Sequence, residues 1–509
     1  MNAAQKKAEA ITAVKRNAQE SGLEFFHDRW RKAWATVRVN GHRENWRVDS
    51  PELRLWVERA LYETIGEAPN TWVNAIIEAF RVHALYDGPM LDVHVRVAEQ
   101  NGILYIDLAD EQWRAVEITP NGWNVVDQPK VKFRRSLGMA ALPEPINGGG
   151  DLRELTRFLN IGSKHEILVL AWMTHAFRPN VPYPVLALSG VQGAGKSTTT
   201  KNLRSLVDPS LAELTDPPRN KRDLVFAASN CRVLAIDNMS DISLVLSDAL
   251  CRAATGGAHR ERKYHKNDGS EEIFVYQNPI IINGIGHLPQ RPDLLDRCLL
   301  VHQEPISEIQ RQNRNFLQQF REALPRLFGA LLDVVCAGLR NVDNVKIASL
   351  PRMADFACWG TAIEETLGFQ SGEFLTAYWA NITDAHAIAV ETSPIARTVH
   401  DYLIEHAKFS NTPFELLKTL NNFADCRDHN SPALVRKNPD WPKNAIQVSK
   451  ALARIEPDLA KLGIRIERSR TRHYRLITLE LMTMSDVGDK AAKSTVTEEP
   501  VENTQGVAA

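Results

Sequence analysis

The segment PVLALSGVQGAGKSTTTKNL, at residues 184–203, constrains the fold of this chain more than any other. Residues 184–189 form a short apolar run typical of a buried strand, and a helical pattern follows the glycines directly. Residues 190–197 have the spacing G-x-x-x-x-G-K-S. Glycines at these positions let backbone N–H groups curl around phosphate, and the helix N-terminus adds positive potential. The segment therefore predicts a phosphate-binding loop within an α/β sheet.

Each residue type in this loop suits one part of nucleotide binding. Lys196 would reach the β- and γ-phosphates, and the Ser197 hydroxyl would ligate Mg²⁺. The alternative is a glycine-rich turn with a chance Lys-Ser, and the strand–loop–helix context argues against it. ATP and Mg²⁺ are therefore the predicted cofactors. The predicted nucleotide-binding residues are Gly190, Gln192, Gly193, Ala194, Gly195, Lys196, Ser197 and Thr198.

Two further apolar runs end in polar side chains. Residues 231–237 end in Asp237, which is predicted to hold the Mg²⁺ shell together with Ser197. Many motor ATPases place a glutamate after this aspartate, but here the next residue is Asn238. Asp241 is a possible substitute base, and the alternative is that it caps the helix expected near residue 242. Asn283 ends the second run and is predicted to lie beside the γ-phosphate and orient water.

Two arginines flank an acidic loop in QRPDLLDR, at residues 290–297. Arg291 or Arg297 could cross a subunit boundary and stabilise charge on the nucleotide of a neighbouring copy. The alternative is that they pair with Asp293 or Asp296 on a surface loop. We favour the catalytic role for at least one of them.

Together these motifs resemble those of AAA+ ATPases, and more narrowly the helicase-type ATPases of phages, plasmids and integrated elements, such as superfamily-3 and minichromosome-maintenance-like helicases. SDALCRAATGG, PIIINGI, RPDLLDR and PRMADFA also resemble bacterial and prophage proteins called only "ATP-binding protein". The resemblance covers most of the chain and is most specific for the ATPase core. It implies ring assembly, often hexameric, with ATP sites between subunits.

Changes in hydrophobic period divide the chain. We expect an N-terminal domain of helices (residues 1 to about 86) and a β-meander at 1–150, an α/β ATPase core at 151–305, a helical region at 306–390, a winged helix-turn-helix at 391–482 and a disordered tail at 483–509. Within the N-terminal part, helices are expected at residues 51–65 and 71–84, with Asn70 as a cap. Asn101-Gly102 and Asn121-Gly122 predict hairpin turns in the meander.

Composition excludes several classes of protein. Lys plus Arg is 61 and Asp plus Glu is 62, so a globally basic nucleic-acid coat protein is excluded, although local basic patches remain possible. No apolar run reaches the roughly 20 residues that span a bilayer, and the first residues are too polar for a secretory signal. None of the 6 cysteines forms a C-x-x-C pair. We therefore expect a cytoplasmic protein without membrane partners.

Two basic elements are candidates for DNA contact. A hairpin is expected from residues 259–265 and 273–277, at a position where the helicases that the chain resembles insert a hairpin into their channel. In the C-terminal unit, three helices and a two-stranded wing suggest a winged helix, although such modules also dock proteins. The predicted DNA-binding residues are Arg260, Arg262, Lys263 and Lys266 in the hairpin and Lys450, Arg468, Arg470 and Arg472 in the C-terminal unit.

The β-meander carries a third group of aromatic and basic residues. It could form a platform for single-stranded nucleic acid, but we favour an apolar core with a solvated basic face. The group comprises Trp113, Trp123, Lys130, Lys132, Phe133, Arg134 and Arg135.

The predicted function is an ATP-hydrolysing DNA motor, a replicative-type helicase of a phage or mobile element acting on single-stranded or forked DNA. The alternative is a non-unwinding ATPase switch or loader that binds DNA or a partner protein through its winged helix. A small-molecule kinase would leave Asn283, the RPDLLDR loop and the winged helix unexplained.

Overall fold

The computed structural model describes residues 3–148, 150–262, 271–286, 289, 291–306, 315–427, 441–470 and 474–482. The chain divides into two compact units. The first comprises Met1–Pro289 and Arg297–Trp379, and the second comprises Gln290–Asp296 and Ala380–Ala509. Among the described residues, no helix is long and apolar enough to cross a membrane.

The first unit begins with three helices around a small antiparallel sheet, of strand order β1-β2-β3. Its elements are α1 (Ala3–Glu20), β1 (Glu24–His27), β2 (Ala33–Val39), β3 (His42–Arg47), α2 (Pro51–Ile65) and α3 (Asn70–Tyr86). The prediction of helix throughout residues 1 to about 86 is therefore wrong for residues 24–47. Asn40-Gly41 joins β2 to β3 as a two-residue turn, with both residues at positive φ, so the hairpin had a local signal that was overlooked.

The two predicted helices of this region are present with small differences. The first was predicted over the range that α2 occupies, where Ser50 accepts a hydrogen bond from the N–H of Leu53. The second is longer than predicted, because α3 begins at Asn70 itself. The cap position is Pro69, which makes no side-chain hydrogen bond, so the prediction of Asn70 as the cap was wrong.

An antiparallel meander of order β5-β6-β7-β8 follows, with β4 and β9 paired beside it in parallel. The strands are β4 (Val93–His94), β5 (Val97–Gln100), β6 (Ile103–Asp107), β7 (Ala115–Thr119), β8 (Gly122–Val126) and β9 (Lys132–Phe133). The predicted Asn101-Gly102 turn joins Gln100 to Ile103. The second turn lies one residue earlier than predicted, because Gly122 already pairs with Thr119.

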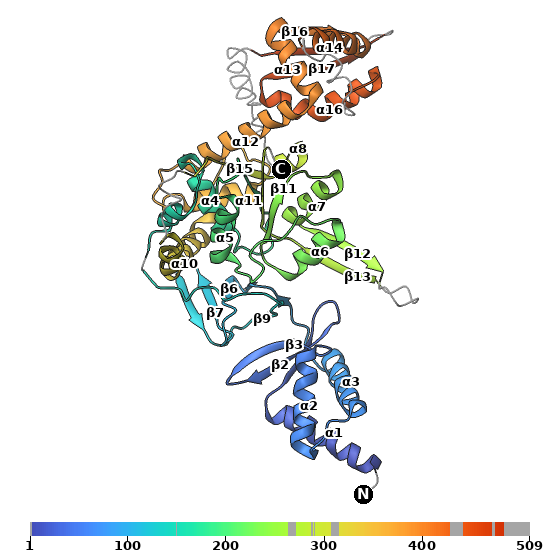
Figure 1. Ribbon diagram of the computed structural model, residues 1–509, viewed down its shortest axis with the longest axis vertical. Helices are drawn as coiled ribbons and strands as arrows, with labels where there is room; N and C mark the ends of the chain where they lie inside the picture. Colours follow the sequence, from blue (N-terminus) through green and yellow to red (C-terminus); the bar gives the residue numbers. More distant parts are fainter. Residues whose placement is uncertain are drawn as a thin grey trace, which may run out of the picture. The chain divides into compact units, whose positions relative to one another are not determined.

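A four-stranded parallel sheet of order β11-β14-β10-β15 forms the centre of the first unit and confirms the predicted mixed α/β class (Figure 1). Its strands are β10 (Val185–Gly190), β11 (Leu234–Met239), β14 (Ile280–Gly284) and β15 (Cys298–Gln303). Consecutive residues of β10 and β14 are buried, which requires cover on both faces of the sheet. Thr215 adds one parallel bridge to Ile236 at the β11 edge.

Helices and a separate hairpin complete the first unit. They are η1 (Leu152–Phe158), α4 (Ser163–His175), α5 (Lys196–Val207), α6 (Lys221–Asn230), α7 (Leu244–Thr255), β12 (Gly257–Arg262), β13 (Glu271–Tyr276), α10 (Phe316–Asn341), η2 (Val342–Asn344) and α11 (Ala354–Ile363). Within the described ranges, β12 and β13 pair only with each other, as an antiparallel ribbon beside α6 (Figure 1). Helix α12 (Glu373–Thr392) begins in the first unit and ends in the second.

The second unit contains helices and an antiparallel sheet of order β16-β18-β17. Its elements are α8 (Pro292–Leu295), α13 (Pro394–His406), β16 (Lys408–Asn411), α14 (Pro413–Arg427), α16 (Ala445–Lys461), β17 (Ile464–Arg470) and β18 (Arg475–Leu481). The sequence predicted two of these strands and missed β16, which is only four residues long. The predicted tail at 483–509 lies outside the described residues.

Candidate nucleotide and nucleic-acid sites

The glycine-rich loop, residues 190–197, joins the carboxyl end of β10 to the N-terminus of α5. Gly190, Gly193 and Gly195 all have positive φ. A Cβ on Gly190 would lie 2.4 Å from the backbone oxygen of Gln303, and one on Gly195 would lie 2.7 Å from Cδ1 of Ile306. No side chain caps the first turn of α5, whose N-cap residue is Gly195. The loop therefore needs glycine for its course and leaves the helix N-terminus available to an anion.

The Lys196 ammonium turns back over this loop. Its Nζ donates hydrogen bonds to the carbonyl oxygens of Gly190 and Val191, at 2.8 and 2.9 Å. Partial burial lowers the pKa of Lys196, and the nearby carboxylate of Asp237 raises it in opposition. The lysine is thus held beside the loop by acceptors that a phosphate oxygen could replace.

Ser197 and Asp237 meet at the same edge of the sheet. The Ser197 hydroxyl donates a hydrogen bond to Oδ1 of Asp237 over 2.8 Å. Asp237 is half-buried near the end of β11, where its backbone N–H donates to the carbonyl of Thr215 over 2.9 Å. Residues 40 positions apart in sequence therefore form one hydroxyl–carboxylate pair beside Lys196.

The other loop residues fall into two groups. Gln192 and Thr198 have exposed side chains, as contact with a nucleotide would require. Ala194 is fully buried, and its carbonyl accepts a hydrogen bond from Nδ2 of Asn160 over 2.8 Å.

Sequence reasoning missed two residues that brace this loop. Asn160 Nδ2 also donates to the carbonyl of Glu304 over 2.6 Å, so it ties the loop to the end of β15. Gln303 is fully buried, and its Nε2 donates a hydrogen bond over 2.8 Å to Oγ1 of Thr199, in the helix that follows the loop. A polar residue at the end of the apolar run CLLVHQ was a usable signal for Gln303, whereas nothing local marks Asn160.

Asn283 is 1% exposed near the end of β14. Its Oδ1 accepts from the backbone N–H of Asn238 over 3.0 Å, and its Nδ2 donates to Thr200 Oγ1 over 3.0 Å. Both ends of the amide are engaged by the protein. This geometry makes Asn283 a brace between β11 and α5, and its place beside the γ-phosphate, where it would orient water, stays a prediction.

Asn238 directly follows Asp237 within β11, and Asp241 lies two residues beyond the end of this strand. Asn238 is exposed and has a φ of 55°, in the left-handed region that asparagine tolerates. Asp241 accepts a hydrogen bond from the N–H of Ile242 over 2.8 Å. The helix it was considered to cap begins later, at Leu244, and Ser243 is its cap. Asp241 is therefore not the cap of α7.

The two arginines of the RPDLLDR motif belong to different units. Arg291 is the N-cap residue of α8 in the second unit. Arg297 begins the return of the chain to the first unit, where its carbonyl accepts from the N–H of Val185 over 2.8 Å.

The β12–β13 ribbon has two chemically different faces. Glu261 and Glu272 are directly opposite each other, and each is paired with a cation from elsewhere: Arg222 at 3.1 Å and Lys32 at 3.2 Å. These ion pairs offset the repulsion between the two carboxylates. Arg260 lies on the other face and is exposed. Lys263, Lys266 and the side chain of Arg262 lie outside the described residues.

Helix α16 has an apolar side and a polar side. Val448, Leu452 and Ile455 are buried in the core of the second unit, whereas Lys450 and Arg454 are exposed. The amphipathic pattern leaves the basic side chains on the surface of the unit.

The far end of the β17–β18 hairpin is rich in arginine. Arg470 lies directly opposite Arg475, and both are exposed. Like charges directly opposite each other destabilise a strand pair unless something neutralises them. Arg468 is also exposed but donates to Glu456 over 2.7 Å. Arg472 lies outside the described residues.

Comparisons with known proteins give one family. Residues 151–387 match the profile of the actinomycete integrative conjugative element replication protein, and residues 395–495 match the C-terminal domain of that same protein. No curated protein matches the chain.

Solved structures with some likeness include two forms of the NrS-1 C-terminal region. One, the A-form apo structure, has 13% identity and a TM-score of 0.42, covering 92% of this chain and 98% of that one. The apo structure of residues 305–718 has 12% identity, a TM-score of 0.36 and the same coverage. JCV helicase with a bound acetamide compound has 13% identity and a TM-score of 0.21, covering 46% of this chain and 70% of that one.

The two profile matches follow one another along the chain and name the same protein, so through residues 151–387 and 395–495 this chain belongs to the replication-protein family of actinomycete integrative conjugative elements.

Proposed function

We propose that this protein is an ATP-hydrolysing DNA motor of AAA+ type that acts as a replicative helicase of its conjugative element. The observation that carries the proposal is the 2.8 Å hydrogen bond between Ser197 and Asp237, beside Lys196 and the uncapped N-terminus of α5. A hydroxyl, a carboxylate and an amine thus converge at a helix N-terminus that no side chain caps. That set of groups suits a triphosphate with its metal ion better than any other common ligand.

The donor set fits Mg²⁺ with ATP. Ser197 and Asp237 would hold the ion, and Mg²⁺ usually takes one or two protein oxygens and completes its shell with water and phosphate. Among the described residues, no group of three or more His, Cys, Asp or Glu side chains converges into a metal cage. Bound Mg²⁺ would neutralise charge on the β- and γ-phosphate oxygens.

The residues of this chain would perform distinct tasks around the triphosphate. Gly190 and Gly195 let the loop pass close to Gln303 and Ile306. Lys196 would exchange its two carbonyl partners for phosphate oxygens. The N-terminus of α5 would contribute positive potential. Asn283 positions the irregular end of β11 that contains Asp237 and Asn238. Arg291 or Arg297 would reach the nucleotide bound to a neighbouring copy of the chain. This contact between copies requires a ring-shaped assembly, and we propose a hexamer.

DNA contact is assigned to the two basic elements. Arg260 on the outer face of the β12–β13 ribbon would contact the backbone of a single strand during translocation. We infer that α13, α14, α16 and the β17–β18 hairpin form a winged helix. Lys450 would then lie on its recognition helix, and Arg468, Arg470 and Arg475 on its wing.

The test is ATP hydrolysis with and without single-stranded DNA, with particle mass recorded in the same buffer. Wild-type protein should hydrolyse ATP faster with DNA and should form a ring-sized particle. Lys196→Ala should abolish hydrolysis while keeping the far-ultraviolet circular dichroism spectrum. Arg260→Glu should keep basal hydrolysis but lose stimulation by DNA, whereas Arg59→Glu, on exposed α2, should behave as wild type. Full turnover by Lys196→Ala would refute the assigned site.

A second candidate, an ATPase switch that does not unwind DNA, is favoured by one observation. Asn238 stands where motor ATPases often carry an acid, and the nearby Asp241 carboxylate is hydrogen-bonded to the backbone of its own turn. A site without a strong general base would hydrolyse ATP slowly. Hydrolysis that is slow and unchanged by DNA would support the switch over the motor.

A further inference from the structure

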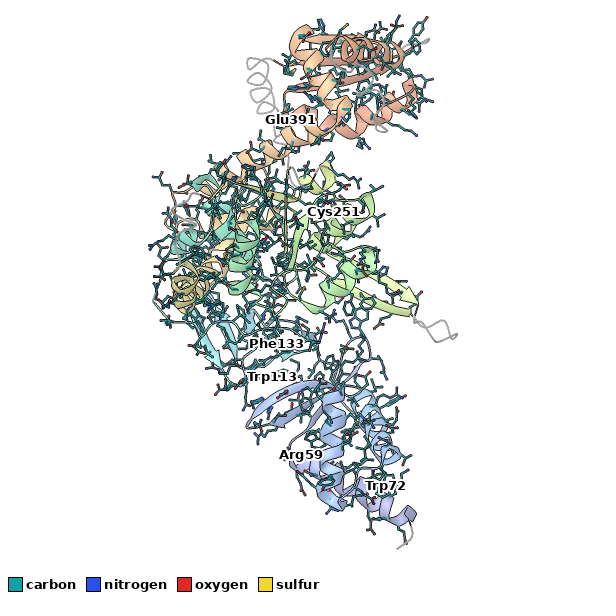
Figure 2. All side chains as sticks on the ribbon, in the orientation of Figure 1. Arg59, Trp72, Trp113, Phe133, Cys251 and Glu391 are labelled. Carbon is teal, nitrogen blue, oxygen red and sulfur yellow. The ribbon has the colours of Figure 1, made fainter. Side chains whose placement is uncertain are left out.

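A polar cavity of about 280 Å³ lies in the first unit, between the N-terminal sheet and the segment before β9. The lining residues that matter here are Arg43, Asn45, Trp113, Lys130, Lys132 and Phe133. Figure 2 labels Trp113 and Phe133. This volume is close to the lower limit of about 300 Å³ for ligand pockets in proteins, so any ligand would be no larger than a single nucleotide unit.

Trp113 is held in an unusual way. Its φ is 58°, a left-handed conformation that is rare for a bulky side chain and that recurs at ligand clamps. The guanidinium of Arg135 lies over the indole ring, 4.0 Å from its centroid. Arg135 in turn donates two hydrogen bonds, of 3.1 and 2.7 Å, to the carboxylate of Asp107, which is 1% exposed. The indole is therefore fixed in place by its own backbone and by a buried ion pair.

Three cations, Arg43, Lys130 and Lys132, line the same cavity, and one carboxylate binds two of them. Lys132 and Arg43 both bind Glu24, at 3.1 and 3.0 Å. Lys130 is exposed and has no ion pair or hydrogen bond within the described part of the chain. Asp127 also lines the cavity and offsets part of this charge.

The floor of the cavity is a fixed chain of hydrogen bonds. Lys132 Nζ donates to Thr36 Oγ1 over 2.8 Å, and Thr36 donates to Asn45 Oδ1 over 2.7 Å. Asn45 Nδ2 then donates to the carbonyl of Phe133 over 3.0 Å. These four residues are thus already ordered before any ligand binds, which reduces the entropy cost of binding.

We propose that this cavity binds single-stranded DNA through one nucleotide, whose base stacks on Trp113 and whose phosphates contact Lys130 and Arg43. An aromatic ring with neighbouring cations is the arrangement that binds single strands without reading their sequence. The inference goes beyond the proposed motor, because it needs neither ATP hydrolysis nor the β12–β13 ribbon. It gives the N-terminal region, which lies outside the matched family segments, a role in holding the strand.

The experiment measures the affinity of full-length protein for a fluorescently labelled oligo(dT), by anisotropy and without ATP. Trp113→Gly removes the ring and suits the left-handed backbone, so the variant should fold. We expect it to bind about tenfold more weakly, with Trp113→Phe in between. Trp30→Ala, which removes an exposed tryptophan that does not line the cavity, should bind like wild type.

Salt dependence separates the role of Lys130 from that of Trp113. Lys130→Gln should reduce the slope of log affinity against log salt by about 0.7, because one phosphate contact is lost. Trp113→Gly should leave this slope unchanged. A thermal unfolding curve for each variant checks that the N-terminal region is intact.

Two results would overturn the inference. The first is wild-type affinity in Trp113→Gly. The second is a competition experiment in which free dTMP displaces the labelled oligonucleotide as effectively as unlabelled oligo(dT) does, at equal concentrations of binding sites. The cavity would then bind a free nucleotide and not a DNA strand. A comparison of the single variants Trp113→Gly and Arg260→Glu separates this inference from the proposed function. If only the Arg260 change weakens binding, the cavity is not a DNA site. If only the Trp113 change does, the cavity proposal stands and the ribbon contact fails.

Discussion

Asn283 accepts a hydrogen bond from the backbone N–H of Asn238 over 3.0 Å, and so joins the ends of two neighbouring parallel strands. Asn238 directly follows Asp237, which bonds Ser197. Asn283 also donates to Thr200 in α5, the helix that carries Lys196 and Ser197. A single buried amide therefore holds both halves of the candidate nucleotide site in register.

Asn283→Ala is expected to lower kcat for ATP hydrolysis about tenfold or more, with a small change in KM, because the end of β11 that carries Asp237 and Asn238 loses its brace. The matched variant is Thr200→Val, which removes the contact with α5 but keeps the bond to Asn238. It should retain most of kcat. Steady-state kinetics of both variants make the comparison, and equal losses would mean that the amide acts only through general stability.

Gly190→Ala should abolish nucleotide binding and destabilise the protein by about 1–3 kcal/mol, because the new methyl group would overlap the Gln303 carbonyl. Gly162→Ala is the control. A Cβ on Gly162 meets nothing within 4 Å, and its φ is −70°. That variant should lose less than about 1 kcal/mol and bind nucleotide normally. Binding of a fluorescent ATP analogue and thermal unfolding test both expectations.

Asp208 is the buried partner of a fully buried arginine. It accepts from Arg96 Nε over 2.9 Å and from the backbone N–H groups of Arg232 and Val233 over 2.8 and 2.9 Å. Asp208→Asn removes the counter-charge of Arg96 and should destabilise the first unit by about 3–5 kcal/mol.

The control for this variant is Glu63→Gln. The Arg59–Glu63 pair lies on the solvent-exposed surface of α2, so breaking it should leave the free energy of unfolding nearly unchanged. Urea unfolding provides the measurement. Equal effects of the two substitutions would contradict the assigned importance of the buried pair.

His175 should make the first unit sensitive to acid. Burial lowers its pKa to about 3, from a value near 6.5 in an unfolded chain. Its Nε2 donates to the carbonyl of Pro182 over 2.9 Å, and Nδ1 has no hydrogen-bond partner among the described residues. Between these two pKa values the unfolded state binds a proton that the folded state does not. Stability is therefore full above about pH 6.5 and is lost as the pH falls.

The expected loss from His175 between pH 7 and pH 5 is about 2 kcal/mol. His175→Phe should remove this part of the pH dependence, although its stability at pH 7 can also change because the Pro182 carbonyl loses its donor. The slope of unfolding free energy against pH is the readout. His165, whose pKa burial lowers to about 4, is unchanged in the variant and should leave a residual slope.

Elements with local signals could be predicted from sequence. The strand–loop–helix around Gly190 was recognisable because its glycines, buried strand and helix adjoin one another. The helix over α2 was recognisable from its period and from Pro51 at its first position. The hairpin at Asn40-Gly41 carried an equally local signal, so its omission was an error of interpretation and not a limit of the sequence.

The contacts around Asn283 could not be predicted in the same way. Its type and position at a strand end indicated a place in the site. Whether the amide faced a ligand or the protein depended on where Asn238 and Thr200 came to lie, 45 and 83 positions away. The same holds for Asn160, which braces the glycine-rich loop from a segment without any motif.

Local patterns in the chain were enough to indicate most of the strands, turns and helices, although not β16, and the residue types at the ends of the parallel strands. Those features follow from hydrophobic period and turn chemistry, which act over a few residues. The pairing of distant groups became visible in the folded chain alone: Arg96 with Asp208, Glu24 with both Arg43 and Lys132, and Trp113 with Arg135. Side-chain packing and the desolvation of charge select such pairs, and both act only after the chain has brought distant segments together.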